Sequence, residues 1–287
     1  MYQPDFSDIQ FRASSLEALV DTSIKNKYED ALTIIEQAEY DKWLADGKTH
    51  LKSFLKLQEK IDKKANQNYL EITDSTKTEL YNIWLKSIGI AQFTGSKDTD
   101  RGDNYEQASI ELLNFAYNEN FEKNSERKFN KIIQGEADIV ATKSVVDIKT
   151  KSTFVTFDKA NQTTADNHFW QLWGYKKLYN KDLSHIAFCL PSYTDVDIYK
   201  AQELKTKNIS EVEEIKKTKE QVYSNMNFDR FNKKSLVKLF KVDSLKLKND
   251  KILKDTEIDE NLVYELLQQC RVYLQGISNN NLHLFKN

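Results

Sequence analysis

The sequence predicts an α/β protein in which a small β-rich core is enclosed by helices at both ends of the chain. Only 7 glycines and 2 prolines occur in 287 residues, which favours long helices. Charged stretches with helical periodicity occupy both ends, whereas short runs rich in Val and Ile lie in the middle. There, the order of helix, two strands, helix and strand is typical of an α/β core.

The composition limits the class of protein. Hydrophobic residues make up 39% and charged residues 30% of the chain, which is enough apolar material for a sizeable core. There is no apolar run of about 18 residues, so no membrane span is expected. The N-terminal stretch MYQPDFSDIQ lacks the features of a secretory signal, and the two cysteines show no metal-type pairing, so we expect a cytoplasmic protein. The net charge of -2 excludes a uniformly basic surface but not a local basic groove.

The N-terminal part is predicted to be helical. Residues 23–68 are rich in Lys, Glu, Asp, Ala and Leu with helical periodicity, which predicts two long helices in a hairpin. Residues 74–89 predict a further helix, with Asp74 or Ser75 as its N-cap and Gly89 as its stop.

The middle region alternates between the two kinds of element. Four segments have strand character, and they are RKFNKIIQGEADIVAT, SVVDIKT, SHIAFCLPS and TDVDIYKA. Two segments have helical character, and they are GDNYEQASIELLNFAYN and NHFWQLWGYKKLYN. The expected apolar side of the first of these helices carries Ala108, Leu112, Phe115 and Ala116. From about Ala201 onward the chain is predicted to be helical and charged.

Two acids and a lysine lie on neighbouring predicted strands. Alternation along SVVDIKT puts Asp147 and Lys149 on one face, and pairing with GEADIV as a hairpin brings Asp138 close to Asp147. Two carboxylates and the main-chain carbonyl of Ile148 suit Mg²⁺ and leave positions for water and a phosphate oxygen. Such an ion lowers the pKa of a bound water, which Lys149 can assist, so the pattern indicates phosphodiester hydrolysis. The simpler alternative is a surface salt bridge, worth under about 1 kcal/mol.

Four blocks, in this order along the chain, resemble the PD-(D/E)xK nuclease superfamily, and within it the lambda-type phage exonucleases and their RecB-like relatives. The blocks are RGDNYEQASIELLNF, GEADIV, VVDIKTK and HFWQLWGY. Ala137 stands where the family name has proline. The resemblance implies a restriction-endonuclease-like mixed β-sheet core flanked by helices. It implies a nuclease domain over residues 1–200 that includes a helical insertion at 23–75, and a helical C-terminal extension at 201–287.

The resemblance also implies roles for particular residues. Catalytic roles fall on Glu106, Asp138, Asp147, Lys149 and Gln171. Ligands of Mg²⁺, for which Mn²⁺ can substitute, are Glu106, Asp138, Asp147 and the carbonyl of Ile148. Contacts with nucleic acid fall on Arg12, Ser14, Lys151 and Tyr175. Ser14 matches a family element that contacts a terminal phosphate of DNA, but it can equally be a simple helix N-cap, and Arg12 is not at the usual position of the family's arginine.

The function expected from these patterns is a Mg²⁺-dependent DNA exonuclease of the kind used in phage recombination or DNA processing. One alternative is a structure-specific or restriction-type endonuclease on the same core. Others are a catalytically silent DNA-binding or assembly protein, and a helical scaffold in which the four blocks occur by chance. The partners implied are linear duplex DNA ends, further copies of the chain in a homo-oligomer and a single-strand annealing protein, with no membrane.

Overall fold

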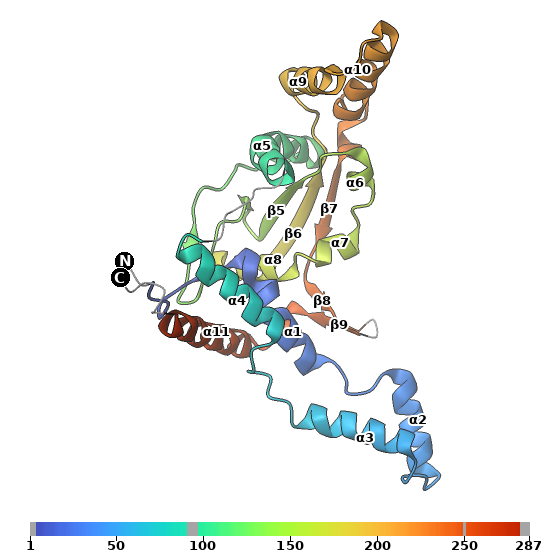
Figure 1. The fold of residues 1–287 in the computed structure, drawn as a ribbon, viewed down its shortest axis with the longest axis vertical. Helices are drawn as coiled ribbons and strands as arrows, with labels where there is room; N and C mark the ends of the chain where they lie inside the picture. Colours follow the sequence, from blue (N-terminus) through green and yellow to red (C-terminus); the bar gives the residue numbers. More distant parts are fainter. Residues whose placement is uncertain (1–3, 91–96, 249–250, 282–287) are drawn as a thin grey trace. The chain divides into compact units, whose positions relative to one another are not determined.

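The computed structural model describes residues 4–90, 97–248 and 251–281 (Figure 1). The chain forms two compact units, which are described separately. Unit 1 contains Met1–Gln92, Phe129–Gln134 and Asp243–Asn287, and unit 2 contains Phe93–Lys128 and Gly135–Val242. The described residues combine helices with several sheets, which confirms the predicted α/β fold class.

Unit 2 is organised around a four-stranded sheet in the order β4-β5-β6-β7. The strands are β4 (Ile139–Val140), β5 (Ser144–Thr150), β6 (Leu183–Cys189) and β7 (Val237–Lys241). β5 is parallel to β6, and the two outer strands are antiparallel to their neighbours. Ile139 lies opposite Val146, so the hairpin predicted for these two segments is present.

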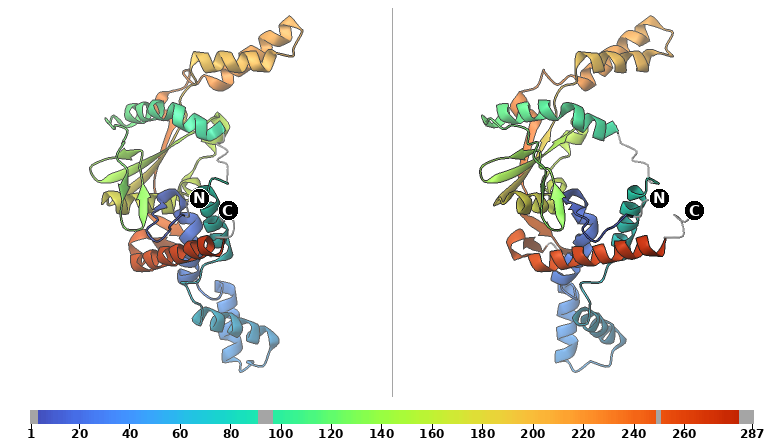
Figure 2. Two further views of the ribbon diagram at one scale, coloured as in Figure 1. Left: turned by 60° about the vertical axis from the view of Figure 1, so that its left-hand side comes forward. Right: turned by 90° about the vertical axis from the view of Figure 1, so that its left-hand side faces the viewer.

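Two helices cover opposite faces of this sheet (Figure 2). They are α5 (Lys97–Tyr117) and α8 (Phe169–Tyr179). The hydroxyl of Ser109 in α5 hydrogen-bonds with that of Thr150 at 2.8 Å, whereas Gln171 in α8 donates to Asp147 Oδ1 at 2.9 Å. Because side chains three positions apart on a strand point to opposite faces, the two helices lie on opposite sides of β5. β5 is therefore covered on both faces, and four of its consecutive residues are buried: Val145, Val146, Asp147 and Ile148.

Two short helices precede α8 in the crossover between the parallel strands β5 and β6. They are α6 (Phe154–Asp158) and α7 (Gln162–Asp166). Both begin at a side-chain cap, because Thr153 accepts the N–H of Thr156 and Asn161 accepts the N–H of Thr164. These caps fix where the chain turns after it leaves β5.

A helical hairpin lies between β6 and β7, where the sequence analysis predicted a strand at TDVDIYKA. Its elements are α9 (Asp195–Thr206) and α10 (Val212–Met226), followed by the 3₁₀ turn η2 (Lys233–Leu236). The strand prediction was wrong. Thr194 caps α9 by accepting the N–H of Asp197 at 3.2 Å, and the acids in the first turn favour a helix N-terminus. These local signals outweigh the short alternation of apolar residues.

The buried stripe of α5 differs from the predicted apolar side. Leu112 is buried as expected, but Phe115 is 56% exposed. The other buried side chains on the described part of α5 are Arg101, Tyr105, Ser109, Ile110 and Leu113. Helix α5 therefore packs with a face that is rotated slightly from the one predicted by its apolar residues. The reason is that small and polar residues of α5 are buried as well.

Unit 1 is built around three helices that pack pairwise. They are α1 (Leu16–Tyr28), α4 (Asp74–Ser87) and α11 (Glu260–Asn280). Their buried residues include Leu19, Ile24, Leu80, Trp84, Val263, Leu267 and Leu274. The N-cap of α4 is Thr73, one residue earlier than predicted, and accepts the N–H of Thr76. Gly89 ends the helix region with a φ of +74°, as predicted, since this backbone conformation favours glycine.

The remaining described elements are a helical hairpin, two small sheets and two 3₁₀ turns. A helical hairpin consists of α2 (Ile34–Ala45) and α3 (Lys52–Ala65), in which the rings of Tyr40 and Phe54 stack at 4.7 Å. A three-stranded sheet has the order β1-β3-β2, and β8 pairs with β9. The bounds are β1 (Phe11–Arg12), η1 (Ala13–Ser15), β2 (Lys128–Phe129), β3 (Ile133–Gly135), β8 (Ser244–Lys246), β9 (Ile252–Lys254) and η4 (Asp255–Glu257).

The units do not follow the predicted division at residue 200. β7 lies in the segment predicted to be a helical extension, yet it is the outer strand of the unit 2 sheet. β7 is paired with a strand about fifty residues earlier in the chain, and local periodicity carries no information on such a partner. Among the helices that the structure describes, none has both the length and the apolar character needed to span a bilayer.

Candidate active site

The hairpin of β4 and β5 brings Asp138 and Asp147 together in unit 2. Asp138 directly precedes β4, and the pairing of Ile139 with Val146 places it beside Asp147. One oxygen of Asp138, Oδ2, accepts the backbone N–H of Ile148 at 2.6 Å. Asp147 is 2% exposed. The convergence of the two acids predicted from strand alternation is therefore present.

The two carboxyl groups are electrostatically coupled. Burial, followed by the negative charge of Asp147, raises the pKa of Asp138 to about 8. The N–H of Ile148 and the positive charge of Lys149 oppose this rise, and the charge of Glu106 adds to it. Two coupled, buried carboxylates cannot both be charged unless a cation offsets their charge. Without a cation, one of them holds a proton. The site therefore has the electrostatic character of a cation-binding site.

Lys149 provides part of the positive charge at this site. Its Nζ lies 2.8 Å from Asp147 Oδ2. Burial lowers the pKa of Lys149, but the charge of Asp147, a hydrogen bond with it and the charge of Asp138 together raise the pKa above its ordinary value. Lys149 is therefore held as an ammonium beside the acids, and its side chain keeps 31% of its surface exposed.

Helix α8 supports the carboxylate of Asp147 from one face of the sheet. Gln171 and Tyr175 are one helical turn apart, and the Gln171 side-chain amide donates both to Asp147 Oδ1 at 2.9 Å and to Tyr175 Oη at 3.0 Å. Tyr175 is only 6% exposed, and burial and then the charge of Asp147 raise its pKa. In the structure the Tyr175 hydroxyl contacts Gln171. Contact of Tyr175 with nucleic acid stays a prediction.

Glu106 is placed near the two aspartates but already has a partner. Its Oε2 pairs with Lys123 Nζ, and its side chain is 16% exposed. The hydrogen bond with Glu106 raises the pKa of Lys123, and the charges of Asp138 and Glu136 add to this effect. Lys123 is thus a cation in the acidic cluster that no sequence motif predicts. It lies in a loop outside the four blocks, so only its closeness in sequence to GEADIV could have drawn attention to it.

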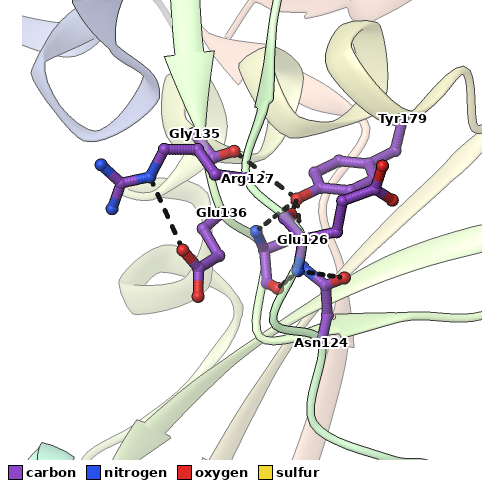
Figure 3. Close-up of polar contacts among 7 residues, drawn as sticks. Asn124, Glu126, Arg127, Gly135, Glu136 and Tyr179 are labelled. Carbon is purple, nitrogen blue, oxygen red and sulfur yellow. Dashed lines mark hydrogen bonds and ion pairs between the residues drawn. The ribbon is translucent and has the colours of Figure 1, made fainter.

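The loop that continues from Lys123 is held by hydrogen bonds of Asn124, and Figure 3 shows the contact of Asn124 with Tyr179. The N–H of Asn124 donates to the backbone oxygen of Asp138 at 2.7 Å, and the Asn124 side chain donates to Tyr179 Oη at 3.1 Å. Arg127 Nε lies 3.6 Å from Glu136 Oε2. These contacts set the position of Lys123 relative to the acids through its neighbour Asn124.

His168 also lies close to the site, although no sequence motif points to it. Burial lowers the pKa of His168, the positive charges of Lys149 and Lys151 lower it further, and the charge of Asp147 and a hydrogen bond with Gln171 oppose them. The imidazole is therefore biased toward its neutral form. Its position one residue before α8 is the only sequence feature that connects it with the site.

The donor set suits a hard divalent cation. Asp147 Oδ2 is buried and, within the described residues, makes no hydrogen bond of good geometry besides its contact with Lys149. Asp138, Asp147 and the carbonyl of Ile148 offer oxygen ligands of the type that Mg²⁺ takes. In the described part of the chain, no group of three or more His, Cys, Asp or Glu side chains is already arranged to hold a metal ion. Glu106, the third acid near this pair, is paired with Lys123 in the structure.

The residues predicted to contact nucleic acid lie in different settings. Lys151 follows β5 in unit 2, with Nζ 4.6 Å from the centre of the Phe188 ring. Arg12 and Ser14 are exposed and belong to unit 1. Ser14 lies within the turn η1, and the N-cap of α1 is Ser15, whose side chain makes no capping bond. The alternative in which Ser14 caps α1 is therefore wrong, and the phosphate contact stays a prediction.

Comparison with known proteins supports the fold. No protein-family model matches the sequence. No curated protein matches it either. Among solved structures, a phage related exonuclease from Haemophilus somnus 129PT aligns with 95% of this chain and 96% of its own, with a TM-score of 0.61 and 17% identity. This chain has the fold of that exonuclease. The nuclease-type fold expected from the four sequence blocks is thereby confirmed.

Two further structures share less. LHK-Exo, an alkaline exonuclease from Laribacter hongkongensis, has a TM-score of 0.46 and 9% identity over 74% of this chain and 88% of its own. LHK-Exo in complex with dAMP has a TM-score of 0.42 and 9% identity over 74% of this chain and 84% of its own.

Proposed function

We propose that the protein is a metal-dependent DNA exonuclease that hydrolyses phosphodiester bonds. The observation that carries this proposal is the coupled pair Asp138 and Asp147, with Lys149 held as an ammonium 2.8 Å from Asp147. A fold shared with a phage related exonuclease supports the reaction class. The proposal includes a role in phage-type recombination or DNA processing, with linear duplex ends as substrate.

Each residue of the candidate active site has its own role in this reaction. Asp138, Asp147 and the carbonyl of Ile148 would hold Mg²⁺, which can activate a water and offset the charge that builds on the phosphorus. Lys149 orients the attacking water and offsets negative charge through its ammonium group. Gln171 keeps the Asp147 carboxylate in one orientation through the 2.9 Å hydrogen bond. Lys149 remains charged at neutral pH, because its pKa is raised by the acids.

Glu106 has a conditional role in this arrangement. In the structure, its carboxylate is neutralised by Lys123. A divalent cation held by the two aspartates would compete with Lys123 for the Glu106 carboxylate, and Lys123 could then pair with a phosphate of the substrate.

The test is a cleavage assay on matched linear and covalently closed duplexes. We expect digestion of linear DNA from its ends with Mg²⁺ or Mn²⁺, none with Ca²⁺ or in chelator, and no cut in the closed circle. Asp147→Asn and Lys149→Met should each lower the rate on the order of 10³-fold. Asp158→Asn, which changes an exposed acid of unit 2, is the matched control and should cleave as the wild type does.

Each alternative predicts a different outcome. Cleavage of the closed circle would favour an endonuclease on the same core. DNA binding without cleavage under every metal condition would favour a catalytically silent binding protein. Full activity in excess chelator would overturn the role assigned to the carboxylates.

A further inference from the structure

A stacked pair of aromatic rings in unit 2 consists of the exposed Phe154, four residues after β5, and the partly buried Phe231. Phe154 and Phe231 stack with their ring centres 5.4 Å apart and their planes 18° from parallel. Phe154 is 43% exposed, and its neighbour Val155 is 60% exposed. In α6, Phe157 instead points inward and is 2% exposed. The short helix thus buries one phenylalanine and presents the other to solvent.

Positive charges accompany these rings. The guanidinium of Arg230 lies 5.1 Å from the centre of the Phe231 ring, and its Nη2 donates to the backbone oxygen of Ser224 at 3.1 Å. Lys233 Nζ lies 5.7 Å from the centre of the Phe115 ring, which is itself 56% exposed. Within the described residues, neither Arg230 nor Lys233 forms an ion pair with a carboxylate. The charges are therefore available to a ligand.

Acidic side chains lie close to these rings as well: Asp158 follows Phe154 by four residues in α6, and Glu119 lines a pocket together with Phe115 and Lys234. Asp229 is the nearest in sequence, and its Oδ1 accepts a hydrogen bond from the hydroxyl of Ser192 at 2.9 Å. The turn from Arg230 to Lys234 has the sequence RFNKK, with three cations and no acid. Exposed aromatic faces interleaved with cations are the combination that proteins use to bind unpaired nucleic acid.

The position of the rings relates them to the candidate active site. Phe154 follows Lys149 by five residues, and five residues of chain span at most about 18 Å. Both residues belong to unit 2, so this limit applies within one compact unit. The Cα atoms of Lys149 and Phe154 therefore lie within about 18 Å of each other.

We propose that Phe115, Phe154, Arg230, Phe231 and Lys233 form an aromatic–cation surface that binds single-stranded DNA by base stacking and phosphate contact. The choice of DNA rests on the proposed function, because an exonuclease that degrades one strand of a duplex leaves the other unpaired. Bases in a duplex are stacked on one another and do not offer a free face to Phe154. The surface therefore selects single strands.

The test measures DNA binding without cleavage. Fluorescence anisotropy in EDTA reports the affinity for a labelled oligothymidylate and for a duplex of the same length. Phe154→Ala should weaken binding of the oligothymidylate about tenfold and that of the duplex by less than about twofold. Phe154→Tyr keeps an aromatic face and should bind as the wild type does, whereas Phe154→Leu should bind as weakly as Phe154→Ala. Tyr199→Ala is the matched control, since Tyr199 is an exposed aromatic of α9 in the same unit and should not matter.

The cations have a separate readout. Arg230→Gln and Lys233→Gln should each reduce the slope of log affinity against log salt by about 0.7 for a single strand. Three outcomes would overturn the proposal: no measurable binding of oligothymidylate by the wild type, an equal loss on the duplex, or wild-type binding by Phe154→Leu. Failure of the proposed nuclease function is distinct, because it would show as absent cleavage with single-strand binding intact.

Discussion

Raising the pH in the absence of divalent cations should destabilise the folded protein through Asp138. Burial and the charge of Asp147 raise the pKa of this carboxyl from 3.8 to about 8 in the folded state. In the unfolded chain the same group loses its proton near the ordinary pKa of about 3.9. Between the two values the folded state holds more protons than the unfolded state, so the free energy of unfolding falls as the pH rises.

The size of the effect follows from the same linkage. One proton corresponds to a slope of at most about 1.4 kcal/mol per pH unit. Asp138 keeps part of its surface exposed, so we expect roughly 0.5–1 kcal/mol per pH unit between about pH 5 and pH 8. His168 acts in the opposite direction, because burial lowers its pKa and the stability that it contributes grows as the pH rises. Asp138→Asn isolates the carboxyl, since the asparagine oxygen can still accept the N–H of Ile148.

The assay is urea unfolding in chelator at a series of pH values, followed by tryptophan fluorescence for the wild type and Asp138→Asn. The difference between the two proteins should decline steadily with pH. Mg²⁺ should remove that decline, because the cation replaces the proton. Parallel curves for the two proteins in chelator would refute a raised pKa at Asp138. A stabilisation by Mg²⁺ that is the same at low and high pH would refute the displacement of this proton by the cation.

Three further predictions concern single side chains. Lys123→Ala should strengthen Mn²⁺ binding about two- to fivefold in calorimetry, because the ammonium no longer competes for the carboxylates. Lys128→Ala is the control and should bind Mn²⁺ as the wild type does, and weaker binding by Lys123→Ala would contradict the prediction. Gln171→Ala should lower the cleavage rate about tenfold or more and Tyr175→Phe by less, since only the amide touches the carboxylate; the reverse order would show that the tyrosine matters more. Ser14→Ala should slow digestion of a 5′-phosphorylated linear duplex more than that of its 5′-hydroxyl form, and an equal fractional loss on both would exclude a phosphate contact.

The sequence alone determined the strand and helix that carry the chemistry. SVVDIKT predicted a strand over the residues that form β5, and the apolar pattern of NHFWQLWGYKKLYN predicted the helix α8. The meeting of Asp138 with Asp147, and of Gln171 with Tyr175, follows from strand and helix periods of two and 3.6 residues. These features are local, so a short window of sequence is enough to specify them.

Tertiary structure decided the features that depend on distant partners. β7 becomes a strand because β6 offers it a free edge, and α5 turns Phe115 outward because the sheet takes the adjacent face. Lys123 pairs with Glu106 from a loop whose next residue, Asn124, donates its N–H to the backbone oxygen of Asp138. The raised pKa of Asp138 likewise depends on burial by segments far apart in sequence. Burial, register and charge coupling are properties of the assembled chain, and no short stretch of sequence contains them.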